Sequence, residues 1–200
     1  MEPDENANLL LLDRKRARLG EPHVAPIVAL CDEIAESRRL PAGAVPYPDP
    51  EHGGTGARAL FVLSHPGAAA PETRFLSLGN QDSSARLALA ECERVGLGMH
   101  EIAHWNAVPF PIAESTPSTT EKQQGAPWLP RLIKLLPELL VVVLLGNPAK
   151  ASWPRAFPWG SDLAVVEGPS PGRPGINRRG AKEELAAAFD EVAKIVRAAR

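Results

Sequence analysis

The residues Leu60-Phe61-Val62-Leu63-Ser64-His65-Pro66-Gly67 set the architecture of this chain. The four apolar residues are typical of a strand buried on both faces, and the polar turn after them ends it abruptly. Two later segments have a similar form: His104-Trp105-Asn106-Ala107-Val108-Pro109 ends a second strand-like run, and Gly168-Pro169-Ser170-Pro171-Gly172-Arg173 follows a third. Because ligands bind at the carboxyl ends of strands in an open α/β sheet, we expect the three segments to meet at one site.

Helix-like and strand-like segments alternate along the rest of the chain. Apolar residues at helical spacing, with a capping signal before the second segment, predict four helices: 25–37, 82–95, 129–136 and 181–197. Apolar runs predict four strands: 57–63, 101–105, 139–145 and 162–166. We therefore predict an α/β fold, a three-layer α/β/α sandwich around a mostly parallel sheet of about four strands.

The chain has 200 residues and a formal net charge of −2. This length suits a single domain, which we expect over residues 21–200. Residues 1–20 carry charge runs without clear periodicity, so we expect a flexible N-terminal arm there. No apolar stretch reaches the ~18 residues of a membrane span, and the run 9–12 is too short for a signal peptide. We expect a cytoplasmic protein that does not contact membranes.

The cysteines and scattered histidines give no sign of a metal centre. Cys31 and Cys92 are far apart and form no Cys-x-x-Cys pair, so we expect free thiols and no iron–sulfur cluster. His23, His52 and His100 lack metal-ligand spacing, and we expect them at the surface. The sequence thus predicts no metal and no cofactor.

Together, the three segments resemble the site motifs of the uracil-DNA glycosylase superfamily, in its bacterial branch without iron–sulfur cysteines. Residues 63–67 are similar to the first motif, which is usually Gly-Glu-Ala-Pro-Gly or Gly-Gln-Asp-Pro-Tyr. Residues 105–109 resemble the strand end that bears the base-reading asparagine. Residues 168–171 resemble the second motif, normally His-Pro-Ser-Pro, and Phe75 begins a segment like the one with the base-stacking aromatic. The resemblance covers most of the chain from about Pro26 onward.

The resemblance implies an enzyme that flips a base out of DNA and hydrolyses its N-glycosidic bond. It gives the handling of the attacking water to His65, or to Ser64 beside it, and a neutral imidazole can accept that proton. Asn106 would read the polar edge of a pyrimidine. The residues also allow plainer roles, in which His65 only bonds to its own loop and Asn106 caps a turn.

The resemblance also assigns residues to base binding. Phe75, in one segment with Asn80, would stack on the base and contribute ~1–3 kcal/mol, or else be a core aromatic. Gly67 lacks the tyrosine that some members use to crowd the base, and Gly168 stands where the family has the histidine that faces the leaving base. Both glycines are expected to widen the pocket, which makes a base larger than uracil a candidate.

A DNA-facing loop is implied at the second motif. Ser170 and nearby backbone amides can bind phosphate, and Arg173 or Pro174 can fill the gap left by a flipped base. The plainer alternative is an ordinary Pro/Gly-rich loop. The residues expected to contact DNA are Ser170, Pro171, Arg173, Arg178 and Arg179. The near-neutral charge argues against nonspecific coating of DNA and favours a monomer with one local basic face.

Three functions follow as hypotheses. The first is a monofunctional DNA glycosylase that excises a modified pyrimidine, in particular a bulky modified cytosine of phage DNA, and so acts in antiviral defence. The second is a uracil-DNA glycosylase of base excision repair. The third is a catalytically weak protein that binds modified bases.

Overall fold

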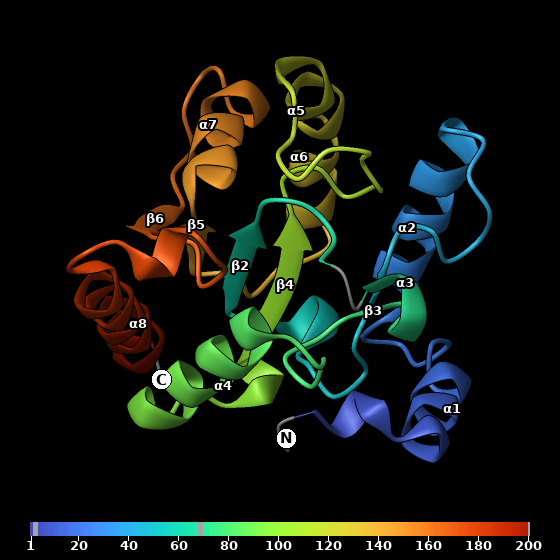
Figure 1. Ribbon diagram of the computed structural model, residues 1–200, viewed down its shortest axis with the longest axis horizontal. Helices are drawn as coiled ribbons and strands as arrows, with labels where there is room; N and C mark the ends of the chain where they lie inside the picture. Colours follow the sequence, from blue (N-terminus) through green and yellow to red (C-terminus); the bar gives the residue numbers. More distant parts are fainter. Residues whose placement is uncertain (2–3, 68–69, 200) are drawn as a thin grey trace.

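The computed structural model describes residues 1, 4–67 and 70–199, and its centre is a four-stranded parallel sheet. The strands lie in the order β4-β2-β5-β6, and each neighbouring pair is parallel. Their bounds are β2 (Ala59–Leu63), β4 (Ile102–Asn106), β5 (Val141–Leu145) and β6 (Ala164–Gly168). Figure 1 shows the arrows of β2 and β4 side by side and pointing the same way. The predicted parallel sheet of four strands is confirmed.

Helices cover both faces of this sheet, which confirms the three predicted layers (Figure 1). One face is covered by α4 (Ser83–Val95) and α8 (Ala181–Ala198). The other is covered by α2 (Ala25–Ser37), α6 (Trp128–Ile133) and α7 (Asn147–Ala156). Because neighbouring strand residues point to opposite faces, Phe61 packs on the face covered by α4 and α8, and Val62 packs on the face covered by α2, α6 and α7.

Smaller elements complete the chain. Two short strands, β1 (Tyr47–Pro48) and β3 (Phe75–Leu76), pair in parallel apart from the main sheet. The remaining α-helices are α1 (Leu9–Ala17), α3 (Ala70–Thr73) and α5 (Thr119–Gly125). Single 3-10 turns occur at Glu5–Ala7, Gly54–Gly56, Met99–Glu101 and Gly175–Asn177. Among the described residues, no helix has the length and apolar character that crossing a bilayer requires.

Residues 2–3 of the flexible arm expected over 1–20 lie outside the described residues, and residues 4–20 differ from that expectation. The side chain of Asn8 caps α1 by accepting hydrogen bonds from the backbone amides of Leu10 and Leu11. Leu12 and Lys15 of this helix are buried against the rest of the chain. The charge run around Lys15 therefore belongs to a packed helix, and part of it is neutralised inside the protein.

Candidate functional site

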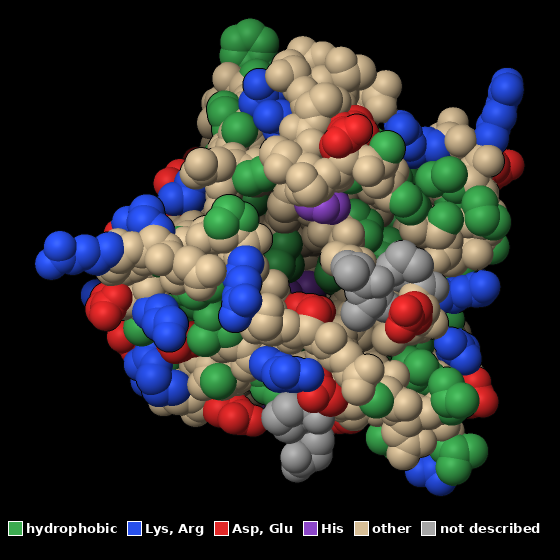
Figure 2. Space-filling view, in the orientation of Figure 1, with side chains coloured by type: hydrophobic (Ala, Val, Ile, Leu, Met, Phe, Trp, Pro, Cys, Tyr) green, Lys and Arg blue, Asp and Glu red, His purple; other side chains and the backbone are tan. Residues whose placement is uncertain are grey.

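A cavity of about 340 Å³ lies at the carboxyl ends of the central strands. The ends of β2 and β5, the middle residue of β4, the first turns of α4 and the loop after β6 all border it. The chain passes from β2 to β4 on one side and then to β5 on the other, so the switch point of the sheet falls beside β2, where ligands of open α/β sheets bind. In Figure 2 this face is hollowed near its centre, with histidine side chains in and beside the hollow.

The cavity brings together about half of the residues that the sequence assigned to a site. Those that line it are Ser64, His65, Gly67, Asn80, Ser170 and Arg173. Those outside its lining are Phe75, Asn106, Gly168, Pro171, Arg178 and Arg179. The three segments quoted first do meet at one edge of the sheet, but not every predicted side chain points into the space between them.

Ser64 and His65 form the polar turn that ends β2. The Ser64 Oγ lies 2.9 Å from the His65 Nδ1, which is hydrogen-bonding distance. Burial of the ring lowers the pKa of His65, against the weaker opposing effect of the Glu121 carboxylate on α5. The imidazole is therefore neutral at pH 7 and keeps one nitrogen that can accept a proton. This pair gives the cavity wall a group able to act as a general base.

Asn80 forms part of another wall and is held within the protein at both ends of its amide. Its Nδ2 donates a 2.8 Å hydrogen bond to the Phe75 carbonyl, and its Oδ1 accepts one of 2.9 Å from the Asn6 Nδ2. An asparagine amide has two N–H donors and two oxygen lone pairs, so one of each remains for a ligand. Asn80 can therefore shape the wall and still offer hydrogen bonds to a bound base.

Ser77 borders the cavity next to Asn80 and is anchored to a buried charge cluster. Its hydroxyl donates to the Asp49 carboxylate, which also lies 2.7 Å from the Lys15 Nζ. Burial acts to raise the pKa of Asp49, but the charges of His52 and Lys15, with hydrogen bonds from Lys15 and Ser77, outweigh it and lower that pKa. Glu5 is a second carboxylate partner of Lys15. The N-terminal helix thus fixes this wall of the cavity.

Phe75 does not occupy the position expected of a base-stacking ring. Its side chain is fully buried, and it does not border the cavity. Leu76, the next residue of β3, lines the cavity instead, because alternate residues of a strand face opposite sides. The expected stacking of Phe75 on a base is therefore corrected in favour of the alternative, a core aromatic.

Asn106 is also buried away from the cavity. It is 2 % exposed, and within the described part of the chain its Oδ1 has no hydrogen-bond partner. The residues that follow it tie β4 to the turn after β2: the Ala107 amide donates to the Leu63 carbonyl, and the Val108 amide to that of Ser64. The expected base-reading role of Asn106 is not supported by its place in the structure. Trp105, the residue before it, is buried in the core.

The two glycines of the motifs differ in what surrounds them. A Cβ added to Gly168 would lie 3.0 Å from the Leu145 Cδ2 and 3.3 Å from the Ala188 Cβ, so this position faces the packing of α8 on the sheet. Close helix packing, not pocket width, thus accounts for the glycine, and its expected contribution to the pocket is corrected. By contrast, a Cβ added to Gly67 would meet no described atom within 4 Å outside its chain neighbours.

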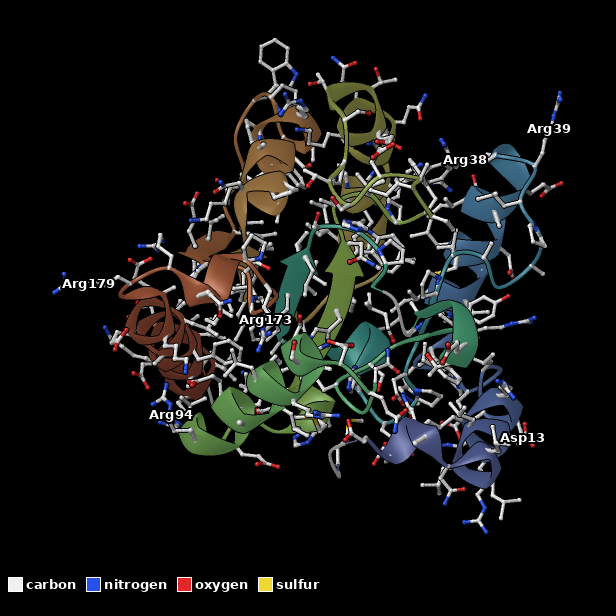
Figure 3. All side chains as sticks on the ribbon, in the orientation of Figure 1. Asp13, Arg38, Arg39, Arg94, Arg173 and Arg179 are labelled. Atoms are coloured by element: carbon white, nitrogen blue, oxygen red, sulfur yellow. The ribbon has the colours of Figure 1, made fainter. Side chains whose placement is uncertain are left out.

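The loop after β6 brings one arginine to the cavity. Arg173 lies beside α4 near the centre of Figure 3, whereas Arg179 extends outward at the left edge. Arg178 pairs with the Glu184 carboxylate of α8, and Pro171 is buried. Among the arginines expected to contact DNA, Arg173 is thus the one that adjoins the cavity, and Pro171 is not available for such a contact.

His104 is a cavity residue that the sequence analysis did not assign to the site. It lies on β4, two residues before Asn106, and its ring borders the cavity. Burial and the neighbouring His52 hold the pKa of His104 well below its usual value. The period of two along a strand already placed His104 on the same face as Asn106, and that was the signal available in the sequence. His52, expected at the surface, is buried instead.

The cysteines lie away from the cavity, and both are free and buried. Burial, with nearby acidic residues, raises the pKa of Cys31 and raises that of Cys92 to about 12. Within the described residues, no group of three or more His, Cys, Asp or Glu side chains is arranged to hold a metal ion. No protein-family model matches the chain, and no curated protein is significantly similar to it.

Proposed function

We propose that the protein is a monofunctional DNA glycosylase, which flips a modified pyrimidine into the cavity and leaves an abasic site. The observation that carries this proposal is the Ser64–His65 pair, a neutral imidazole bonded to a hydroxyl at the carboxyl edge of the sheet. Arg173 at the same cavity adds a positive charge for a DNA phosphate. In this proposal the protein acts as a monomer in the cytoplasm.

The proposed reaction uses His65 as the base. His65 takes a proton from a water near C1′ of the flipped nucleotide, with Ser64 orienting the ring, and the resulting hydroxide bonds to C1′. The N-glycosidic bond breaks, and its electron pair leaves with the base as an anion. The transition state has a positively charged sugar and a negatively charged base, so donors near the base oxygens accelerate the step.

The space beside Gly67 favours a bulky base over uracil. A second cavity of about 510 Å³ shares His65, Gly67 and Ala70 with the first. Since no described atom outside its chain neighbours lies within 4 Å of a Cβ added at Gly67, we propose that a substituent on the base passes Gly67 towards this second cavity. We therefore propose a bulky modified cytosine, such as those of phage DNA, as the substrate and antiviral defence as the role.

Formation of abasic sites tests the proposal. The protein is incubated with a uracil-containing oligonucleotide and, in parallel, with phage DNA that carries hydroxymethylated and glucosylated cytosines, and alkali-sensitive breaks are counted. We expect breaks in the phage DNA. Replacing His65 by alanine should reduce the rate about 10²–10⁴-fold. The matched control is His100→Ala, at an exposed histidine that does not border the cavity.

The other outcomes decide between the remaining functions. Breaks in the uracil oligonucleotide alone would instead indicate a repair enzyme. Base-dependent binding without breaks would favour a protein that only recognises modified bases, and the burial of Phe75 and Asn106 outside the cavity is the observation in favour of that candidate.

A further inference from the structure

Aromatic neighbours hold the ring of His104. It stacks on Phe61 of β2, with ring centroids 5.4 Å apart and an interplanar angle of 18°. Phe61 in turn stacks on Phe189 of α8 at 5.0 Å. On another side the ring of His52 lies 5.0 Å away, tilted by 45°. The ring of His104 is therefore held in one orientation in the lining of the cavity.

This well-packed ring has unused hydrogen-bonding capacity. The Nδ1 of His104 is buried, and it has no hydrogen-bond partner among the residues that the structure describes. A buried nitrogen without a partner destabilises a protein, so native structures rarely keep one without a functional reason or a bound molecule. A phenylalanine would fill the same stacked position without this penalty. His104 also lines the cavity, so a ligand bound there would contact this imidazole.

The protonation state of His104 suits a polar ring as that ligand. A neutral imidazole has one N–H donor and one acceptor nitrogen, which matches the alternating donors and acceptors on the edge of a pyrimidine. Burial and His52 keep this imidazole neutral at pH 7, so it can bind a base without bringing a buried charge. At position 168, where the family that the chain resembles has the histidine that faces the base, this chain has a glycine, and a Cβ there would face the packing of α8.

We propose that His104 hydrogen-bonds the pyrimidine base in the cavity and is the donor to the leaving base. This inference rests on the proposed function for the leaving-base step, whereas the binding of a base by His104 does not depend on turnover. It places the base-contacting histidine on β4 and not at the end of β6.

The variant that tests this is His104→Phe, because it keeps the stacked ring and removes both nitrogens. Loss of a nitrogen that serves only a ligand should leave the urea unfolding midpoint unchanged or raise it. Binding of free uracil, cytosine and 5-hydroxymethylcytosine, measured by calorimetry, should weaken about tenfold or more for the base that binds. Turnover of a cleavable DNA should fall with it. His100→Phe, at an exposed histidine, is the matched control.

Ring-nitrogen NMR of histidine-labelled protein gives a second readout. Addition of the bound base should shift the His104 resonances and leave those of His100 in place. The inference is overturned if His104→Phe binds bases as the wild type does, if it mainly lowers stability, or if none of the three bases shifts His104. Absence of excision from any DNA, with a base still bound through His104, would instead remove the glycosylase proposal and leave the binding site standing.

Discussion

Removing the charge of Lys15 is expected to destabilise the protein strongly. The Lys15 side chain is 6 % exposed, and its partners Asp49 and Glu5 are 0 % and 14 % exposed. Lys15→Met keeps most of the aliphatic stem but leaves the Asp49 carboxylate buried without its ammonium partner. Breaking a buried ion pair from one side costs about 3–5 kcal/mol, because the remaining charge is left uncompensated. The free energy of unfolding should fall by this amount.

Urea unfolding followed by tryptophan fluorescence measures this loss, since the chain has four tryptophans. In a thermal scan the same change corresponds to a decrease in Tm of ~6–20 °C for a chain of this length. The matched control is Lys194→Met, at a lysine with a 77 % exposed side chain, which should change stability by less than ~0.5 kcal/mol. Adding Asp49→Asn to Lys15→Met should cost less than the sum of the two single changes, because it removes the stranded charge.

The reasoning would be refuted if Lys15→Met lost less than ~1 kcal/mol, or if the double variant were simply additive. Either result would mean that the pair is solvated and that the N-terminal helix does not anchor the wall formed by Ser77 and Asn80. Because we expect the Lys15–Asp49 pair to anchor this wall, Lys15→Met should also weaken base binding.

Two further predictions concern packing and pH. Gly168→Ala should lower the free energy of unfolding by ~1–3 kcal/mol, because its methyl group would crowd the packing of α8. Gly67→Ala should change it by less than ~0.5 kcal/mol. Equal urea midpoints for the two variants would contradict the contact assigned to Gly168. Stability should also fall as the pH drops below about 6.5, because the pKa values of His52 and His104 are lowered in the folded state, so the unfolded chain binds more protons there. Urea midpoints at pH 7.5 and 5.5 check this, and a flat profile would mean that these histidines take up protons in the folded protein as readily as in the unfolded chain.

The elements that the sequence predicted correctly are those whose signals are local. The run Val141–Leu145 is apolar at every position, as a central parallel strand requires, and Asp82 caps α4 through its side chain as its position suggested. Besides α1 and the one-turn α3, two further helices were missed. The capping box of Ser118 and Glu121 marks the start of α5, but it lies inside a polar segment. Pro154 lies inside α7, and a proline is unfavourable within a helix, so the sequence did not predict the helix that begins directly after β5.

The site was predictable only as far as the backbone determines it. Ser64 and His65 reach the cavity because they follow directly on a strand whose end faces it. The burial of Phe75 and the contact of Gly168 with α8 depend on which residues pack against them. The spacing of residues in one sequence does not contain that information. The pairing of Lys15 with Asp49 joins residues 34 positions apart, so no local sequence pattern predicts it.

The structure separates the position of the site from the residues that carry its chemistry. Strand order fixes the position, because the switch point beside β2 opens a crevice whatever side chains line it. The side chains are free to change, and in this chain a histidine borders the crevice from β4 while the glycine of the second motif serves helix packing. A glycosylase built in this way would hold the base from β4 and attack its sugar from the turn after β2. Selectivity would then respond to changes at His104 and Gly67, and changes at position 168 would act through stability alone.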